Sequence, residues 1–149
     1  MSVRNSRLVG VICGIAAVIP IVVWGQQPAS TKAKIYVYRY RHFAGKMLEP
    51  SVYCDEAQLA RMENGRFFAV TVDPGEHIFR ANDTQSGVRL EVQPGERYYL
   101  RVELVAGFWK GHGRLVLVPK EQGAFEIARL KPLDPDKIRD TARVNSERN

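Results

Sequence analysis

The stretch RFFAVTVDPGEHIFRA (residues 66–81) alternates side chains of different polarity on both sides of a Pro-Gly pair, and VRLEVQPGERYYLRVEL (residues 88–104) repeats this arrangement. Successive side chains of a β-strand point to opposite faces, so each stretch predicts strand, turn and strand. In both turns proline sets φ at the first central position and glycine supplies a positive φ at the second, as a type II turn requires. The two copies predict two strand-turn-strand units in one sheet system.

Turn signals every 8–12 residues or so extend this pattern along the chain, which is typical of an all-β domain. Residues 35–40 (IYVYRY) form a strictly alternating strand with its tyrosines on one face. Asn64-Gly65 predicts a type I′ hairpin. Asp55–Met62 is rich in helix formers, but its surroundings favour a turn and a short edge strand. Residues 122–133 fit either a strand or a short helix.

These elements predict one domain, an antiparallel β-sandwich of about seven to eight strands at residues 34–133. A chain of 149 residues with 45% hydrophobic residues is long enough and apolar enough to bury a core. Residues 26–33 are expected to be a linker. Residues 134–149 have Ile138 and Val144 as their only large apolar residues, so we expect a polar tail that is disordered or a frayed helix.

The first 25 residues are typical of a secretory signal peptide. Arg4 and Arg7 precede an uncharged run, Leu8–Gly25, and the small residue Gly25 suits cleavage before Gln26. The alternative is an uncleaved helix that anchors the chain in the inner membrane through residues 8–25, a run near the lower limit for crossing a bilayer. Either alternative predicts export, to the periplasm or beyond the cell.

Charge and cysteine content exclude several classes of protein. The net charge of +6 falls to +4 without Arg4 and Arg7, and the excess is spread along the chain, so no nucleic-acid partner is predicted. Cys13 lies in the apolar run, which leaves Cys54 as the one cysteine of the domain. The sequence is therefore neither a disulfide scaffold nor a four-cysteine zinc module.

The motifs together resemble a bacterial family of small exported domains of unknown function. They are Tyr36-Val37-Tyr38-Arg39, the turn Pro74-Gly75-Glu76-His77, the strand Gly95–Val102 and the closing strand Leu115–Val118. The chain is also similar to the wider PEGA-like class of β-sandwiches, which have Pro-Gly turns. The resemblance implies a β-sandwich in the cell envelope and supplies no catalytic residues.

Two groups of residues are candidate binding residues. The glycine-rich segment AGFWKGHG (residues 106–113) presents Phe108, Trp109, Lys110 and His112, and aromatic loops make large contact areas at low entropic cost. The alternative is that the aromatic rings fold back and close an open end of the sandwich. The second group is Tyr36, Tyr38 and Tyr40, which form either an aromatic platform for a sugar or an ordinary half-buried face.

No metal site, cofactor or catalytic set is predicted. His42, His77 and His112 are 35 residues apart in each interval, unlike the short spacing of zinc ligands. No serine or cysteine stands in a nucleophile motif. We therefore expect a non-enzymatic binding module of the cell envelope whose partner is an unknown envelope protein or a polysaccharide. The alternatives are a structural domain that self-associates through an edge strand at Ile35–Tyr40, and a small hydrolase that joins Cys54 or a serine to a histidine.

The signal-peptide hypothesis predicts the mass and location of the mature protein. Cell fractionation followed by intact-mass measurement should find a chain that begins at Gln26 in the periplasm or the medium. A full-length mass in the membrane fraction would establish the anchor instead. A full-length chain in the cytosol would contradict export.

Overall fold

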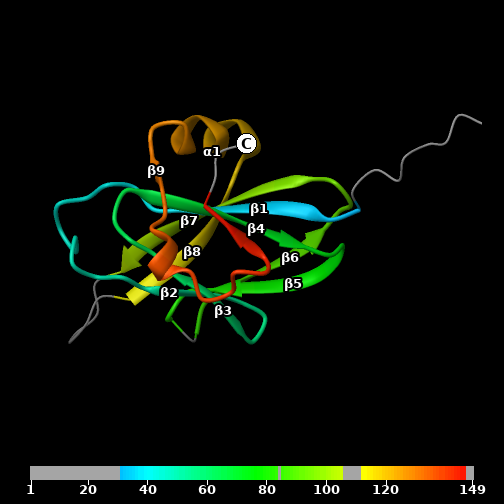
Figure 1. The fold of residues 1–149 in the computed structure, drawn as a ribbon, viewed down its shortest axis with the longest axis horizontal. Coiled ribbons are helices and arrows are strands. Elements are labelled where there is room, and N and C mark those ends of the chain that lie inside the picture. Colours follow the sequence, from blue (N-terminus) through cyan, green and yellow to red (C-terminus); the bar gives the residue numbers. More distant parts are fainter. Residues whose placement is uncertain (1–30, 84, 106–111, 147–149) are drawn as a thin grey trace, which may run out of the picture.

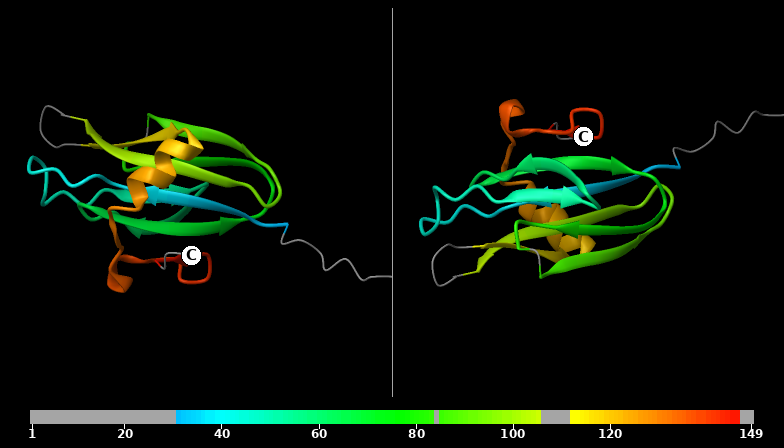
Figure 2. Two further views of the ribbon diagram at one scale, coloured as in Figure 1. Left: turned by 90° about the horizontal axis from the view of Figure 1, so that it is seen from above. Right: turned by 90° about the horizontal axis from the view of Figure 1, so that it is seen from below.

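Two β-sheets stack face to face, and one α-helix lies on the outer face of the larger sheet (Figures 1 and 2). The computed structural model describes residues 31–83, 85–105 and 112–146. Sheet A has six strands, in the spatial order β10 (Val144–Asn145), β4 (Arg66–Val72), β1 (Ala33–Tyr38), β7 (Arg97–Val105) and β8 (His112–Val118), with β9 (Lys131–Pro132) also paired to β4. Sheet B has four, in the order β3 (Ala57–Arg61), β2 (Ser51–Cys54), β5 (Gly75–Arg80) and β6 (Gly87–Val92). The predicted β-rich, two-sheet fold is confirmed.

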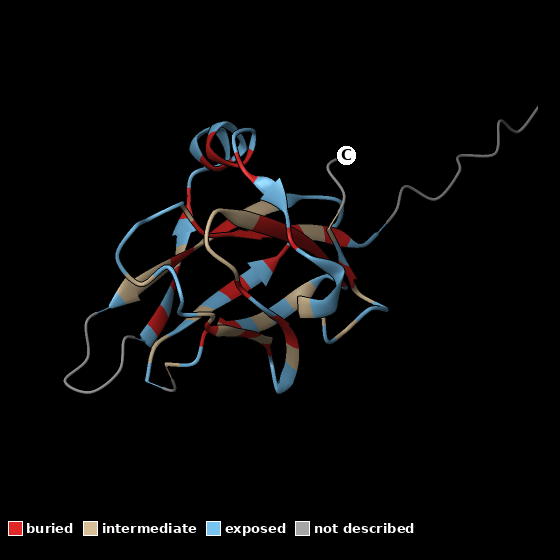
Figure 3. Cartoon of the chain, turned by 60° about the vertical axis from the view of Figure 1, so that its left-hand side comes forward, coloured by how far each residue is buried: buried red, intermediate tan, exposed pale blue. Residues whose placement is uncertain are grey.

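The strand β1 lies in the middle of sheet A, and its alternation defines both faces. Ile35 and Val37 are fully buried against sheet B, in the main core. Tyr36 and Tyr38 point the other way, into a second core under the helix. Figure 3 shows buried residues along the strands and exposed residues in the loops.

The pairing of β1 corrects two expectations. It is antiparallel to β4 but parallel to β7, with Tyr38 opposite Arg101, so the sheet is mixed rather than purely antiparallel. β1 is also hydrogen-bonded on both sides, so it is not the free edge strand that self-association through Ile35–Tyr40 would need.

The Pro-Gly turns join the two sheets, whereas the sequence predicted units within one sheet system. The first turn leads from β4 in sheet A to β5 in sheet B, and the second from β6 in sheet B to β7 in sheet A. In the second, the Glu96 amide donates to the Gln93 carbonyl and Gly95 has φ 72°, as a type II turn requires. The first turn differs from the expected type II turn, because Gly75 has φ 128° and is already the first residue of β5, where it pairs with Val92. Both turns lie where β1 begins, which we call the proximal end.

The structure contradicts the expectation for one short connection and confirms the expectation for another. Asn64-Gly65 is not a hairpin, because β3 belongs to sheet B and β4 to sheet A, and only Gly65 of the pair has a positive φ. The expected turn and strand within Asp55–Met62 are confirmed. Cys54 pairs with Ala57 around a two-residue turn that leads into β3.

The helix α1 (Lys120–Ile127) covers the outer tyrosine face of sheet A, as Figure 2 shows from above. This settles the alternative at residues 122–133, where the chain forms a helix rather than a long strand. A Cβ at Gly123 would lie 2.3 Å from Cβ of Tyr99 on β7, so glycine allows the close approach of helix and sheet. Ile127 and Leu130 complete this second core.

The described part of the tail, residues 134–146, has defined contacts with both sheets, contrary to the expected disorder. After the 3₁₀ helix η1 (Pro135–Lys137), Ile138 bridges to Ala60 of β3, and the Arg139 amide donates to the Leu59 carbonyl. β10 then pairs with β4, and Val144 is buried. Few apolar side chains are needed here, because the tail satisfies backbone groups at the edges of both sheets.

Some sequence expectations fall on residues that the structure does not describe. They are the signal peptide, most of the linker, and the candidates Phe108, Trp109 and Lys110. In the part of the chain that is described, no helix has the length and apolar character of a membrane span.

The contact between α1 and β7 gives a test of the second core. Gly→Ala inside a helix normally stabilises by about 0.5–1 kcal/mol. Gly123→Ala should instead lower the free energy of unfolding by about 1–3 kcal/mol, because the added methyl group meets Tyr99. Urea unfolding measures the change, with the exposed Glu121→Ala as the matched control. A stabilised Gly123→Ala variant would show that α1 does not rest on β7.

Candidate functional site

The candidate residues Tyr36 and Tyr38 lie under α1. They are 5% and 0% exposed, and the Tyr36 ring stacks on Tyr99 with ring centroids 5.1 Å apart. They therefore do not form an exposed sugar platform, which corrects that hypothesis. Tyr40, beyond the end of β1, is half-buried and makes an edge contact with the Tyr38 ring.

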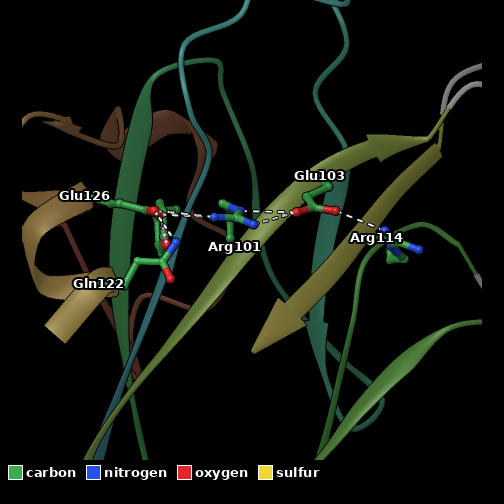
Figure 4. Close-up of polar contacts among 6 residues, drawn as sticks. Arg101, Glu103, Arg114, Gln122 and Glu126 are labelled. Atoms are coloured by element: carbon green, nitrogen blue, oxygen red, sulfur yellow. Dashed lines mark hydrogen bonds and ion pairs between the residues drawn. The ribbon is translucent and has the colours of Figure 1, made fainter. Parts of the chain in front are cut away.

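A buried carboxylate, Glu126, joins the helix to this tyrosine face (Figure 4). It accepts hydrogen bonds from the Tyr38 hydroxyl and, at 2.7 Å, from the Gln122 amide. Arg101 of β7 lies 3.4 Å from both of its oxygens. Burial raises the pKa of Glu126, but these hydrogen bonds and the Arg101 charge outweigh it and hold the pKa below its usual range.

The same arginine continues the polar chain across the sheet. Arg101 pairs with Glu103 at 2.8 Å, and Arg114 of β8 pairs with Glu103 at 3.0 Å (Figure 4). Each charged group of this network, Arg101, Glu103, Arg114 and Glu126, has an opposite partner, and a buried charge such as Glu126 would destabilise the fold without one. We assign this network the role of fixing α1 on sheet A.

The end of the sandwich opposite the proximal turns is built differently, and we call it the distal end. It carries residues 39–50, which join β1 to β2, and the Asn64-Gly65 turn. Because β7 runs parallel to β1 and β8 returns antiparallel to it, Val105 and His112 lie at this end too. In Figure 1 the connection from β1 to β2 is on the left, far from the start of β1.

A buried arginine holds the distal loop. The Arg39 side chain is 1% exposed, and its guanidinium donates to the Gly45 carbonyl at 2.8 Å and to the Leu48 carbonyl. The backbone of the loop is therefore fixed to the core. Its apolar side chains still point into solvent, since Phe43 is 98% and Met47 89% exposed.

A cationic cleft of about 310 Å³ lies beside this loop. The lining residues come from the loop, from the turn before β4 and from the segment after α1. The charged ones are Arg41, Lys46, Glu49, Glu63, Arg66, Arg129 and Lys131.

The two carboxylates of the cleft already have cationic partners. Glu49 binds Lys137 at 2.9 Å and Arg61 at 3.4 Å, and Glu63 lies 3.9 Å from Arg66. Among the described residues, no ion pair is found for the other four cations of the lining, Arg41, Lys46, Arg129 and Lys131. The cleft therefore has a positive charge that the protein does not neutralise.

Two predicted residues border other hollows of the distal end. His112 lines a shallow site with Asn82, Asp83 and Val105. Tyr40 lines a cleft of about 480 Å³ with Arg39 and other residues. Thus His112 and Tyr40 reach the distal surface, and the strand ends that flank Phe108, Trp109 and Lys110 are there as well.

A further cluster lies on sheet B, where Cys54 is close to a histidine, as the hydrolase alternative required. The Cys54 Sγ is 4.0 Å from Nδ1 of His77 and 3.6 Å from Oδ2 of Asp55, and that oxygen is 2.9 Å from the same Nδ1. Burial and the neighbouring Asp55 raise the pKa of the Cys54 thiol to about 12. Burial lowers the pKa of His77, but the Asp55 carboxylate and the Asp73 carbonyl outweigh it and raise the pKa overall.

These features define the protein as a small two-sheet β-sandwich domain with a covering helix and a cationic, apolar-tipped end. The chain belongs to the DUF2846 family, a family of proteins of unknown function, which it matches over residues 29–113. That match includes the distal loop and the Cys54 cluster and ends before α1.

The chain is 26% identical over 107 residues to an uncharacterized protein of Haemophilus influenzae, covering 70% of this chain. The chain spans 63% of the length of that relative. No solved structure matches the chain.

The contribution of Glu126 to the free energy of unfolding should depend on pH. At neutral pH, Glu126→Gln should lower the free energy of unfolding by about 1.5–3 kcal/mol, because charged hydrogen bonds to Tyr38 and Arg101 are lost. The folded-state pKa is depressed, so this stabilisation is complete above the usual value of 4.5 and is lost as pH falls through the lower folded value.

Urea unfolding of both proteins across acidic pH measures this difference, with the exposed Glu121→Gln on the same helix as control. The gap between wild type and Glu126→Gln should shrink as the solution becomes more acidic. A gap that widens would show that Glu126 is protonated in the folded protein.

Proposed function

We propose that this protein is an exported, non-enzymatic binding module of the bacterial cell envelope and that its distal end is the contact surface. The observation that carries the proposal is the composition of that end. Four cations without an ion pair border a loop that exposes Phe43 and Met47, and the buried Arg39 binds the backbone of this loop.

Both kinds of residue favour a partner. Large apolar side chains that gather in solvent mark interaction sites more often than scattered ones do. Unneutralised cations attract an anionic partner and speed its arrival. The proposed partner is therefore an envelope protein or polysaccharide that carries acidic groups.

The orientation of the chain supports an envelope role. Arg4, Arg7 and the run Leu8–Gly25 are typical of export. β1 begins at the proximal end, so a chain anchored through residues 8–25 would present its distal end away from the anchor. The paired Pro-Gly turns at the proximal end support the likeness to PEGA-like sandwiches.

The hydrolase alternative is favoured by one observation, the 4.0 Å separation of Cys54 Sγ and His77 Nδ1. A relay would place the thiol and the carboxylate on opposite nitrogens of the imidazole. Here Asp55 and Cys54 share Nδ1, while Nε2 donates to the Asp73 carbonyl at 2.9 Å. The thiol is also fully buried. These facts favour binding over catalysis.

Binding of the purified protein to isolated envelope material tests the proposal. Lys46→Ala/Arg129→Ala should weaken binding about tenfold, and Phe43→Ala/Met47→Ala by a similar factor, as expected for residues at the centre of an interface. Added salt should weaken wild-type binding and affect the charge variant less.

The matched control is Arg97→Ala/Leu117→Ala, which removes an exposed cation and an exposed apolar side chain away from the distal end. It should bind as the wild type does. If folded distal variants bind as well as the wild type, or the control alone fails to bind, the distal end is not the contact surface.

A further inference from the structure

We propose that Cys54, Asp55 and His77 form a binding site for a divalent cation of the zinc type, with Sγ, Oδ2 and Nδ1 as its ligands. This site lies on sheet B and is independent of the proposed contact surface. Thiolate, imidazole and carboxylate are the three protein ligands that zinc takes, and the sulfur and nitrogen atoms disfavour Mg²⁺ and Ca²⁺.

The three ligand atoms already have a suitable spacing. Their separations are 4.0 Å, 3.6 Å and 2.9 Å. A point equidistant from atoms so placed lies about 2.1 Å from each, which suits zinc bonds to nitrogen and oxygen and is about 0.2 Å shorter than the usual zinc–sulfur bond. A cation can therefore contact all three atoms with small shifts.

The backbone fixes both polar ligands in the required orientation. His77 Nε2 lies 2.9 Å from the Asp73 carbonyl, which can only accept, so Nε2 carries the hydrogen and Nδ1 is the ligand atom. A metal-bound histidine usually donates its other N–H in this way. Asp55 Oδ1 accepts the Ile78 amide at 3.0 Å, which leaves Oδ2 to face the cluster.

The turn that carries Asp55 is built for this position. Asp55 has φ 55°, the one positive φ among the described non-glycine residues. Its amide donates to the Ile78 carbonyl at 2.7 Å, in return for the bond that its carboxylate accepts from the same residue. β2 also pairs with β5 through Cys54 and Phe79, so all three ligands stand on one rigid hairpin and its neighbour.

A positive charge is required between the imidazole of His77 and the carboxylate of Asp55. With Nε2 protonated, a neutral His77 points the Nδ1 lone pair at the Asp55 carboxylate, 2.9 Å away. Either a proton or a cation must lie between them. The Asp55 carboxylate favours a proton at this position, and a bound metal ion would take its place.

The residues around the cluster determine from which side a cation can reach it and how tightly the cation binds. The Cys54 side chain is buried, whereas Asp55 and His77 are 48% and 19% exposed, so a cation arrives from the Asp55 side, where water supplies the fourth ligand. Arg143 of the tail faces Cys54 and is held by Asp140 at 2.6 Å. Its charge favours the thiolate and opposes the cation.

Binding releases protons, which fixes its pH dependence. The Cys54 thiol gives up one proton, and His77, where it is protonated, gives up another. Affinity should therefore rise with pH.

Titration of the purified protein with Co²⁺ tests the site, because cobalt bound to a thiolate has a charge-transfer band in the near ultraviolet. Wild type should show this band at one Co²⁺ per chain, and Zn²⁺ should abolish it. Cys54→Ser should lose the band, and His77→Ala should bind at least tenfold more weakly. Glu56→Gln, which removes the exposed carboxylate next to Asp55, is the matched control and should behave as wild type.

A second measurement protects the test against variants that fold poorly. Zn²⁺ should raise the Tm of the wild type. It should raise the Tm of Asp55→Asn by a smaller amount, because asparagine keeps the contact with Ile78 but lacks the negative charge. Absence of the band at millimolar Co²⁺, or a band or a Tm rise that persists in Cys54→Ser, would overturn the proposal.

Discussion

The strand β1 must be covered on both faces, and the rest of the architecture depends on this. Its inner residues Ile35 and Val37 are covered by sheet B, as in any sandwich. Its outer residues Tyr36 and Tyr38 are too large and apolar to leave in water, and α1 covers them. The Tyr38 hydroxyl then requires an acceptor in that second core, and Glu126 of α1 supplies it. One strand thus links three layers.

Placing β1 at the centre also decides where a binding surface can be. Both faces of sheet A near β1 are occupied, so neither tyrosine is available to a ligand. The parallel pairing of β1 with β7 brings the distal loop and the strand ends around residues 106–111 to the same end of the sandwich. Arg39, the last inward-facing residue of the β1 alternation, fixes the distal loop there.

Strand positions were predictable because they depend on local alternation, as at 35–40 and 66–72. The sheet to which a strand belongs was not, because a Pro-Gly turn has the same local chemistry whether it joins neighbours or opposite sheets. The tail was mispredicted, since hydrogen bonds to β4 and β3 replace the apolar side chains that it lacks. Two of the predicted binding residues, Tyr40 and His112, lie at the distal end, which we propose as the contact surface. The charge at Arg39, on an otherwise apolar face, was a usable signal for the loop anchor. Nothing local joins Cys54 to His77, because only the pairing of β2 with β5 does so.

Hydrogen–deuterium exchange of the protein, alone and with isolated envelope material, tests the assignment of the distal end most directly. The account predicts slower exchange at residues 41–49 and around the Asn64-Gly65 turn when the partner is present. Exchange at the proximal Pro94-Gly95 turn should be unchanged. Protection confined to the proximal turns, with residues 41–49 unaffected, would contradict it.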